Sequence, residues 1–70
     1  MQTKLIILRK ETKTTQQELA KMLGITTASY ISKEHGRNEF KITEMYKIAQ
    51  YFNKNIDDVF VPYILQNGVK

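Results

Sequence analysis

The sequence predicts an all-α fold of five short helices, and two observations lead to this expectation. Helix-breaking residues are scarce, because the 70-residue chain contains only three glycines and one proline. Apolar residues also recur every three or four positions, which is the spacing of one face of a helix. The length fits a single domain, which we expect at residues 1–62, followed by a C-terminal tail at residues 63–70.

Composition limits what can stabilise and bind this chain. It has no cysteine, so neither disulfides nor thiolate-bound zinc can hold it together, and compact helix packing remains. No segment approaches the roughly 20 apolar residues of a membrane span, and the start "MQTKLIILRK" lacks the apolar stretch of a signal peptide. We therefore expect a cytoplasmic protein without membrane contact. The net charge of +4 favours a polyanionic partner without identifying one.

The first two helices are marked by signals at their ends. The first is expected over about residues 2–12. Thr15 and Glu18 stand three residues apart, which is a capping-box pattern at the start of a second helix. Gly24 ends that helix, where a left-handed residue is favoured. The side chains expected to face the core from these helices are Leu5, Leu8, Leu19, Ala20 and Leu23.

A third helix follows after a short turn. Thr26 can cap it, and it is expected to run to about Glu34, with Gly36 ending it as Gly24 ends the second helix. The next stretch, "RNEFK" at residues 37–41, is rich in polar groups and is expected to form a loop.

The last two helices are predicted by an amphipathic pattern and a second cap. "ITEMYKIAQYF" is expected to be a helix whose inward face carries Ile42, Met45, Ile48, Ala49 and Phe52. Asn55, with Asp58 three residues later, can cap a short fifth helix that runs through Phe60. Pro62 closes the regular part of the chain.

The most informative unit is the pair of short helices within residues 16–33. Ala20 is small, as the crossing point of two helices requires, and Gly24 tolerates the positive φ of a tight turn. This is the pattern of a helix-turn-helix, in which the second helix lies in the major groove of DNA.

A resemblance to a known family extends this interpretation. The stretch "LRKETKTTQQELAKMLGIT…SYISKEHGRNEF…ITEMYKIAQYFNKNIDDVF" resembles the Cro/C1-type (XRE) helix-turn-helix domain of phage repressors and bacterial regulators. It covers residues 5–60. The resemblance implies a lambda-repressor-like fold over residues 1–62. It also implies a transcriptional repressor that binds a pseudo-palindromic operator as a homodimer. The variant "SYxxKExGxxEF" is similar to small regulators of phages and mobile elements.

The resemblance also implies roles for individual residues. The side chains expected to face base edges are Thr27, Ala28 and Ser32. Those expected to contact backbone phosphates are Gln16, Thr26, Lys33, His35, Arg37, Asn38 and Lys41. Arg9 and Glu34 match a salt bridge that joins the first and third helices. Because the base-facing side chains are small, we expect weak direct readout and a contribution from DNA shape.

Three positions depart from the family pattern. Tyr30 replaces an aliphatic core residue, and its ring can be buried if its hydroxyl finds a partner. Lys33 stands where Ile or Leu is usual, and we expect its stem to pack while its ammonium group turns toward DNA phosphates. Thr14 replaces a common Leu.

Several residues have a functional and a purely structural interpretation. His35 without neighbouring metal-ligand types indicates a surface residue, and Asp57 and Asp58 fit the start of a helix better than acid chemistry. No catalytic constellation, metal, cofactor or small-molecule ligand is expected. The aromatic side chains at helical spacing are expected in the core or at its edge rather than stacked on bases, and these are Tyr30, Tyr46, Tyr51 and Phe52.

Two questions stay open at this level. The tail residues Tyr63, Ile64 and Leu65 can fold back over the first helix or form a dimer contact. The scaffold itself can bind operator DNA or can have become a protein-binding module, such as an antirepressor or antitoxin-like domain. Salt-dependent DNA binding would distinguish these two functions.

Overall fold

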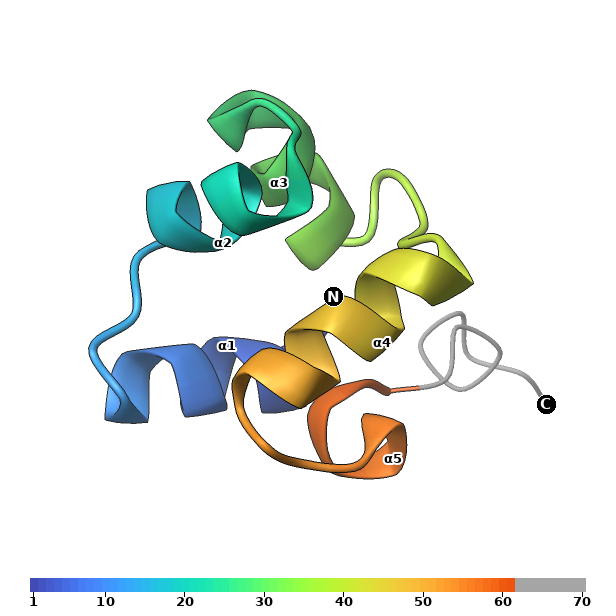
Figure 1. The fold of residues 1–70 in the computed structure, drawn as a ribbon. Coiled ribbons are helices and arrows are strands. Elements are labelled where there is room, and N and C mark those ends of the chain that lie inside the picture. The colour runs from blue at the N-terminus through green and yellow to red at the C-terminus, as the bar shows by residue number, and fades with distance from the viewer. Residues whose placement is uncertain (62–70) are drawn as a thin grey trace, which may run out of the picture.

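A computed structural model describes residues 1–61, and within them five α-helices pack around one hydrophobic core (Figure 1). The helices are α1 (Thr3–Glu11), α2 (Gln16–Leu23), α3 (Thr27–Glu34), α4 (Ile42–Tyr51) and α5 (Ile56–Val59). No strand occurs in this part of the chain. The all-α, five-helix fold that the sequence predicts is confirmed. None of these helices is long and apolar enough to cross a membrane. The tail at residues 63–70 lies outside the described residues.

Helices α2 and α3 lie together at one side of the molecule (Figure 1). They lie at the top of this view, whereas α1, α4 and α5 lie below them and α5 packs on both α1 and α4. The pair α2–α3 is too short to bury its own apolar faces, so α1 and α4 complete the core beneath it. One surface of α3 is left uncovered by this arrangement.

The ends of α2 and α3 form as their sequence signals predict. The backbone N–H of Glu18 donates to Thr15 Oγ1 at 3.0 Å, and the Thr15 N–H donates to Glu18 Oε1 at 2.7 Å. Gly24 adopts φ +75°, and a Cβ added there would meet no atom within 4 Å. Backbone conformation, rather than lack of space, therefore favours glycine at this turn. The Ser29 N–H donates to Thr26 Oγ1 at 3.1 Å, which caps α3.

The core contains most of the expected side chains and one that the sequence analysis placed in a polar loop. The buried apolar residues are Leu5, Leu19, Ala20, Tyr30, Phe40, Ile48, Ala49, Val59 and Phe60. Phe40 is 5% exposed, and its ring meets the edges of Tyr30 and Phe60 at centroid distances of 5.8 and 5.3 Å. The loop after α3 is therefore fixed to the core by one aromatic residue.

Four local expectations are wrong. Ile42 is 59% exposed rather than inward-facing, because it shares the stripe of α4 with Tyr46, one turn later, and neighbouring helices leave that stripe uncovered. Tyr46 and Tyr51 are exposed and do not belong to the core. Asn55 precedes α5, but its side chain makes no capping hydrogen bond.

Candidate nucleic-acid interface

The outward surface of α3 carries small side chains. Ala28 is exposed, and Thr27 and Ser32 are partly exposed, as expected for residues that face DNA bases. Thr26 accepts a hydrogen bond from the Ser29 N–H through its hydroxyl oxygen, so its O–H can still donate to a phosphate. The start of α3 is therefore rigidly capped and open to a ligand.

The chain that follows α3 brings polar and basic side chains to the surface. His35, Arg37, Asn38 and Lys41 are all exposed. The backbone N–H groups of Arg37 and Asn38 donate to the Ser32 carbonyl at 2.9 and 3.3 Å, which folds this segment back onto the end of α3. Arg37 and Asn38 are therefore held against Ser32, with His35 directly before them and Lys41 later in the same segment.

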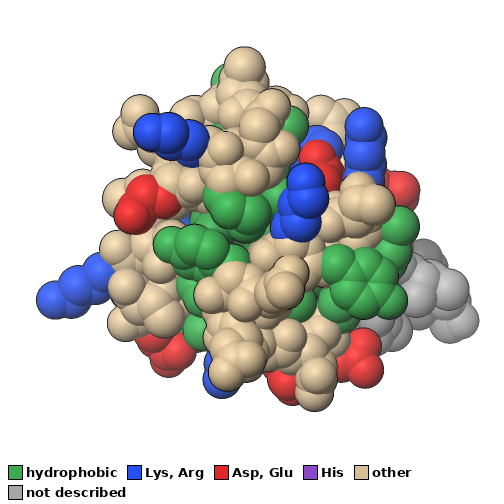
Figure 2. Space-filling view, viewed as in Figure 1, with side chains coloured by type: hydrophobic (Ala, Val, Ile, Leu, Met, Phe, Trp, Pro, Cys, Tyr) green, Lys and Arg blue, Asp and Glu red, His purple; other side chains and the backbone are tan. Residues whose placement is uncertain are grey.

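The space-filling view shows how charge is distributed around this region. Over α2 and α3, at the top of Figure 2, the surface consists mostly of neutral side chains and backbone, with Lys and Arg side chains on either side and Asp or Glu side chains close to them. Such a surface matches a duplex, whose groove exposes neutral base edges and whose two backbones carry the negative charge.

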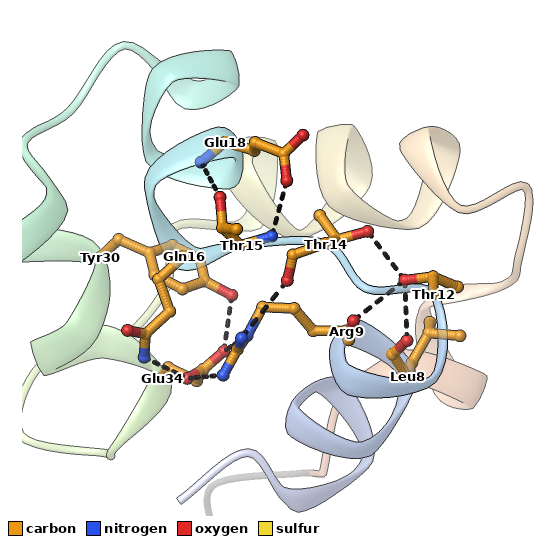
Figure 3. A network of polar contacts seen from close by, with 9 residues as sticks. All are labelled: Leu8, Arg9, Thr12, Thr14, Thr15, Gln16, Glu18, Tyr30 and Glu34. Carbon is orange, nitrogen blue, oxygen red and sulfur yellow. Dashed lines mark hydrogen bonds and ion pairs between the residues drawn. The ribbon is translucent and has the colours of Figure 1, made fainter.

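At the end of α3, the buried carboxylate of Glu34 joins α3 to α1 and α2 (Figure 3). It is 0% exposed and accepts four hydrogen bonds. Arg9 of α1 donates through Nε at 2.9 Å and through its second terminal nitrogen at 3.3 Å. Gln16 of α2 donates through Nε2 at 2.9 Å, and the Tyr30 hydroxyl donates at 2.8 Å. The predicted Arg9–Glu34 pair is confirmed, with two further donors that the sequence analysis did not identify.

The ionisation of this cluster follows from its hydrogen bonds. Burial alone would raise the pKa of the Glu34 carboxyl, but the hydrogen bonds from Arg9, Gln16 and Tyr30 and the charge of Arg9 hold it below its usual 4.5. Burial raises the pKa of the Tyr30 hydroxyl, and the neighbouring Glu34 carboxylate raises it further. Glu34 is therefore an anion and Tyr30 a neutral donor at neutral pH.

This cluster also determines what Gln16 can offer to DNA. One N–H of its side-chain amide is directed at Glu34, so only the second N–H of Nε2 remains to donate to a phosphate. The side chain is held at the start of α2 rather than free in solvent. Its phosphate contact stays a prediction.

The expectation for Lys33 needs a correction. Its ammonium group does not turn outward, but donates to both carboxylate oxygens of Glu44 in α4 at 2.7 and 2.8 Å. Lys33 is 9% exposed and Glu44 is 8% exposed. Burial would raise the pKa of Glu44, but hydrogen bonds from Lys33 and the Lys41 backbone lower it. Lys33 therefore joins α3 to α4, because a carboxylate lies within reach of its stem.

The sequence analysis missed further residues that hold this surface in place. Gln2 is fully buried. Its backbone N–H donates to the Glu34 carbonyl at 2.8 Å, and its side-chain Oε1 accepts from the Val61 N–H at 2.6 Å. Nothing in its local sequence indicates this role. Glu44 is three residues after Lys41, and its Oε1 accepts the Lys41 N–H at 2.8 Å. This is one half of a capping box, and only the Glu at the third helical position was available as a signal, since Lys41 is not a capping residue.

The structure gives no cluster typical of metal binding. Within residues 1–61, no three His, Asp or Glu side chains are grouped so that they could hold a metal ion. Glu34 and Glu44 are each occupied by donors from the protein itself. The chemistry available at the α3 surface is hydrogen bonding, apolar contact and positive charge.

Comparison with known proteins agrees with this geometry. A family model described as helix-turn-helix matches residues 5–59. An HTH-type transcriptional regulator of Archaeoglobus fulgidus is 34% identical over 61 residues, which cover 87% of this chain and 86% of the relative. A second such regulator, from Methanocaldococcus jannaschii, is also 34% identical over 61 residues, covering 87% of this chain and 92% of the relative.

Proposed function

The chain belongs to the Cro/C1-type helix-turn-helix family of transcription regulators, and from this premise we propose that it represses transcription by binding operator DNA as a homodimer. In this proposal α3 enters the major groove, and Thr27, Ala28 and Ser32 meet base edges. The protein blocks or displaces polymerase and does no chemistry. Its cytoplasmic location and its phage or mobile-element type stay predictions.

The observation that supports this proposal most strongly is the continuity between the α3 surface and the basic segment after it. Small, exposed side chains on α3 lead directly into exposed His35, Arg37, Asn38 and Lys41. Base-facing groups need space to approach the groove, whereas phosphate contacts need donors at its edge. Both requirements are met by adjacent residues of one rigid unit.

The set of phosphate contacts that we propose is smaller than the sequence analysis predicts. It contains Gln16 through its remaining N–H, together with Thr26, His35, Arg37, Asn38 and Lys41. Lys33 is left out because its ammonium group is paired with Glu44. In a dimer, two α3 helices would lie about 34 Å apart in successive major grooves, so the operator would be an approximate palindrome.

Selection of bound duplexes from a random pool, followed by titration at several salt concentrations, tests the proposal. Because released counterions drive phosphate contact, we expect the affinity to fall steeply with salt and the selected sites to show two related half-sites. Binding that is absent at low ionic strength would reject DNA binding and favour the protein-binding alternative. Selected sites without two-fold symmetry would reject the dimer.

Arg37→Ala gives a more specific test. We expect it to weaken binding to all duplexes alike and to reduce the logarithmic salt slope by about two, since each protomer of the proposed dimer loses one phosphate contact. The matched control is Lys54→Ala, which removes one exposed positive charge from the α4–α5 turn, on the other side of the molecule from α3 (Figure 1). Equal changes in slope for both variants would show that overall charge, rather than a contact at Arg37, determines the affinity.

A further inference from the structure

Ile31 is an apolar residue of α3 that neither the core nor the expected DNA contacts explain. It is partly exposed. Among the described residues, the half-buried apolar side chains that pack on the core are Leu8, Met22, Leu23, Ile25, Met45, Phe52 and Ile56, and Ile31 does not belong to that set. The buried residues of α3 are Tyr30, Lys33 and Glu34 instead. Ile31 is thus a partly exposed aliphatic side chain of α3 that does not pack on the core.

The position of Ile31 around the helix axis places it among the base-facing residues. An α-helix turns about 100° per residue, so Ile31 lies about 40° from Thr27 and about 60° from Ala28, between the two. It stands one turn further along α3 than Thr27, next to Ser32. A duplex that meets Thr27, Ala28 and Ser32 therefore also meets Ile31.

The chemistry of the major groove offers one apolar group to such a side chain. Thymine carries a C5-methyl there, whereas the other three bases present hydrogen-bond donors and acceptors that an aliphatic group cannot satisfy. An isoleucine pressed against those polar edges would leave them without partners. Contact with a thymine methyl removes apolar surface from water on both sides.

We propose that Ile31 is a specificity-determining residue that selects thymine at one position of each half-site through its C5-methyl group. This inference rests on the proposed function, since it requires α3 to lie in the major groove. It adds a preference for one base to a surface whose other side chains read bases weakly. It also explains why a partly exposed position on this helix, away from the core, is aliphatic.

Deoxyuridine substitution tests this assignment, because it removes the C5-methyl group and leaves the Watson–Crick pair intact. In a duplex selected by the wild-type protein, each thymine is replaced in turn and the dissociation constant is measured by fluorescence anisotropy. We expect one replacement per half-site to weaken wild-type binding about four-fold, as the loss of one buried methyl group implies. For Ile31→Ala, the same replacement should have no effect.

Two further variants make the result specific. Ile31→Val keeps a methyl group on the same face and should retain most of the penalty. Ile7→Ala removes the same side chain from an exposed position on α1, where Ile7 is 56% exposed, and should behave as wild type. Circular dichroism verifies that each variant is folded.

Different failures have different meanings. If DNA is bound but no deoxyuridine penalty depends on residue 31, the role of Ile31 is overturned and the proposed function stands. The same conclusion follows if Ile31→Ala selects the same base at every position. If the protein binds no DNA at low ionic strength, the proposed function falls, and this assignment falls with it.

Discussion

Lys33 and Glu34 are neighbours on α3, and both are charged and buried, yet their surroundings differ. Glu34 is 0% exposed and accepts hydrogen bonds from three helices, α1, α2 and α3 itself. Lys33 lies nearer to the surface and is paired with one residue, Glu44 of α4. Glu34 thus sits in a network, and Lys33 sits in a pair.

The difference shows what a buried charge requires in a domain this small. A fully desolvated carboxylate is stable only when each of its lone pairs has a donor, and Glu34 meets this condition with four hydrogen bonds. A pair at the edge of the core keeps some solvation, so its charges matter less than the packing of its stems. We therefore expect the two clusters to respond very differently to substitution.

The largest effect is expected from Glu34→Ala. The change leaves Arg9, Gln16 and Tyr30 with unsatisfied donors and one uncompensated charge, so the free energy of unfolding should fall by about 3 kcal/mol. Since the free energy of unfolding of a domain this small is only a few kcal/mol, the variant should be largely unfolded or melt far below wild type. Urea denaturation followed by circular dichroism measures this.

Glu39→Ala is the matched control, because Glu39 is exposed in the loop after α3. Its removal should change stability by less than about 0.5 kcal/mol. A similar loss for both variants would mean that the Glu34 network does not determine the stability of the α1–α3 packing.

Tyr30→Phe should have an intermediate effect. It removes only the hydroxyl that donates to Glu34 at 2.8 Å and keeps the ring against Phe40. A hydrogen bond to a charged group contributes about 2 kcal/mol, and we expect a loss of that size. Thermal unfolding by calorimetry gives the value, and a loss below about 0.5 kcal/mol would mean that Tyr30 acts through the packing of its ring rather than through its hydroxyl.

The smallest effect is expected from removing both charges of the second pair. In the wild-type protein the Lys41 N–H donates to the Glu44 carboxylate, and Glu44→Gln keeps a carbonyl oxygen that can accept this hydrogen bond. Lys33→Met keeps the length of the side chain and removes its charge. Lys33→Met alone should cost about 1 kcal/mol by leaving a carboxylate without its cation, and the double variant should regain most of this loss. A double variant as unstable as Tyr30→Phe would show that this pair is not replaceable.

Local signals in the sequence account for much of the fold. Thr15 with Glu18, Gly24 and Thr26 act on their own backbone within four residues, so the bounds of α2 and α3 are predictable. The Arg9–Glu34 pair came from the resemblance to a family rather than from any local pattern.

What could not be predicted depends on partners far away in the chain. Lys33 turns inward because Glu44, eleven residues later on another helix, lies within reach of its Nζ. Phe40 stands in a polar stretch, and its burial follows from the rings of Tyr30 and Phe60, which come from distant parts of the chain. The orientation of a long side chain, and the burial of a lone aromatic, are set by tertiary packing that local periodicity does not record.

The ring of Phe40 has a consequence for the thermodynamics of binding. It fixes the segment that carries Arg37, Asn38 and Lys41 before any ligand arrives, and it touches Tyr30, whose hydroxyl belongs to the Glu34 network. Most of the conformational entropy of this segment is therefore lost on folding and not on association. In the proposed complex a surface fixed in this way would have little freedom to adapt, so we expect the duplex to supply most of the bending that a close fit demands.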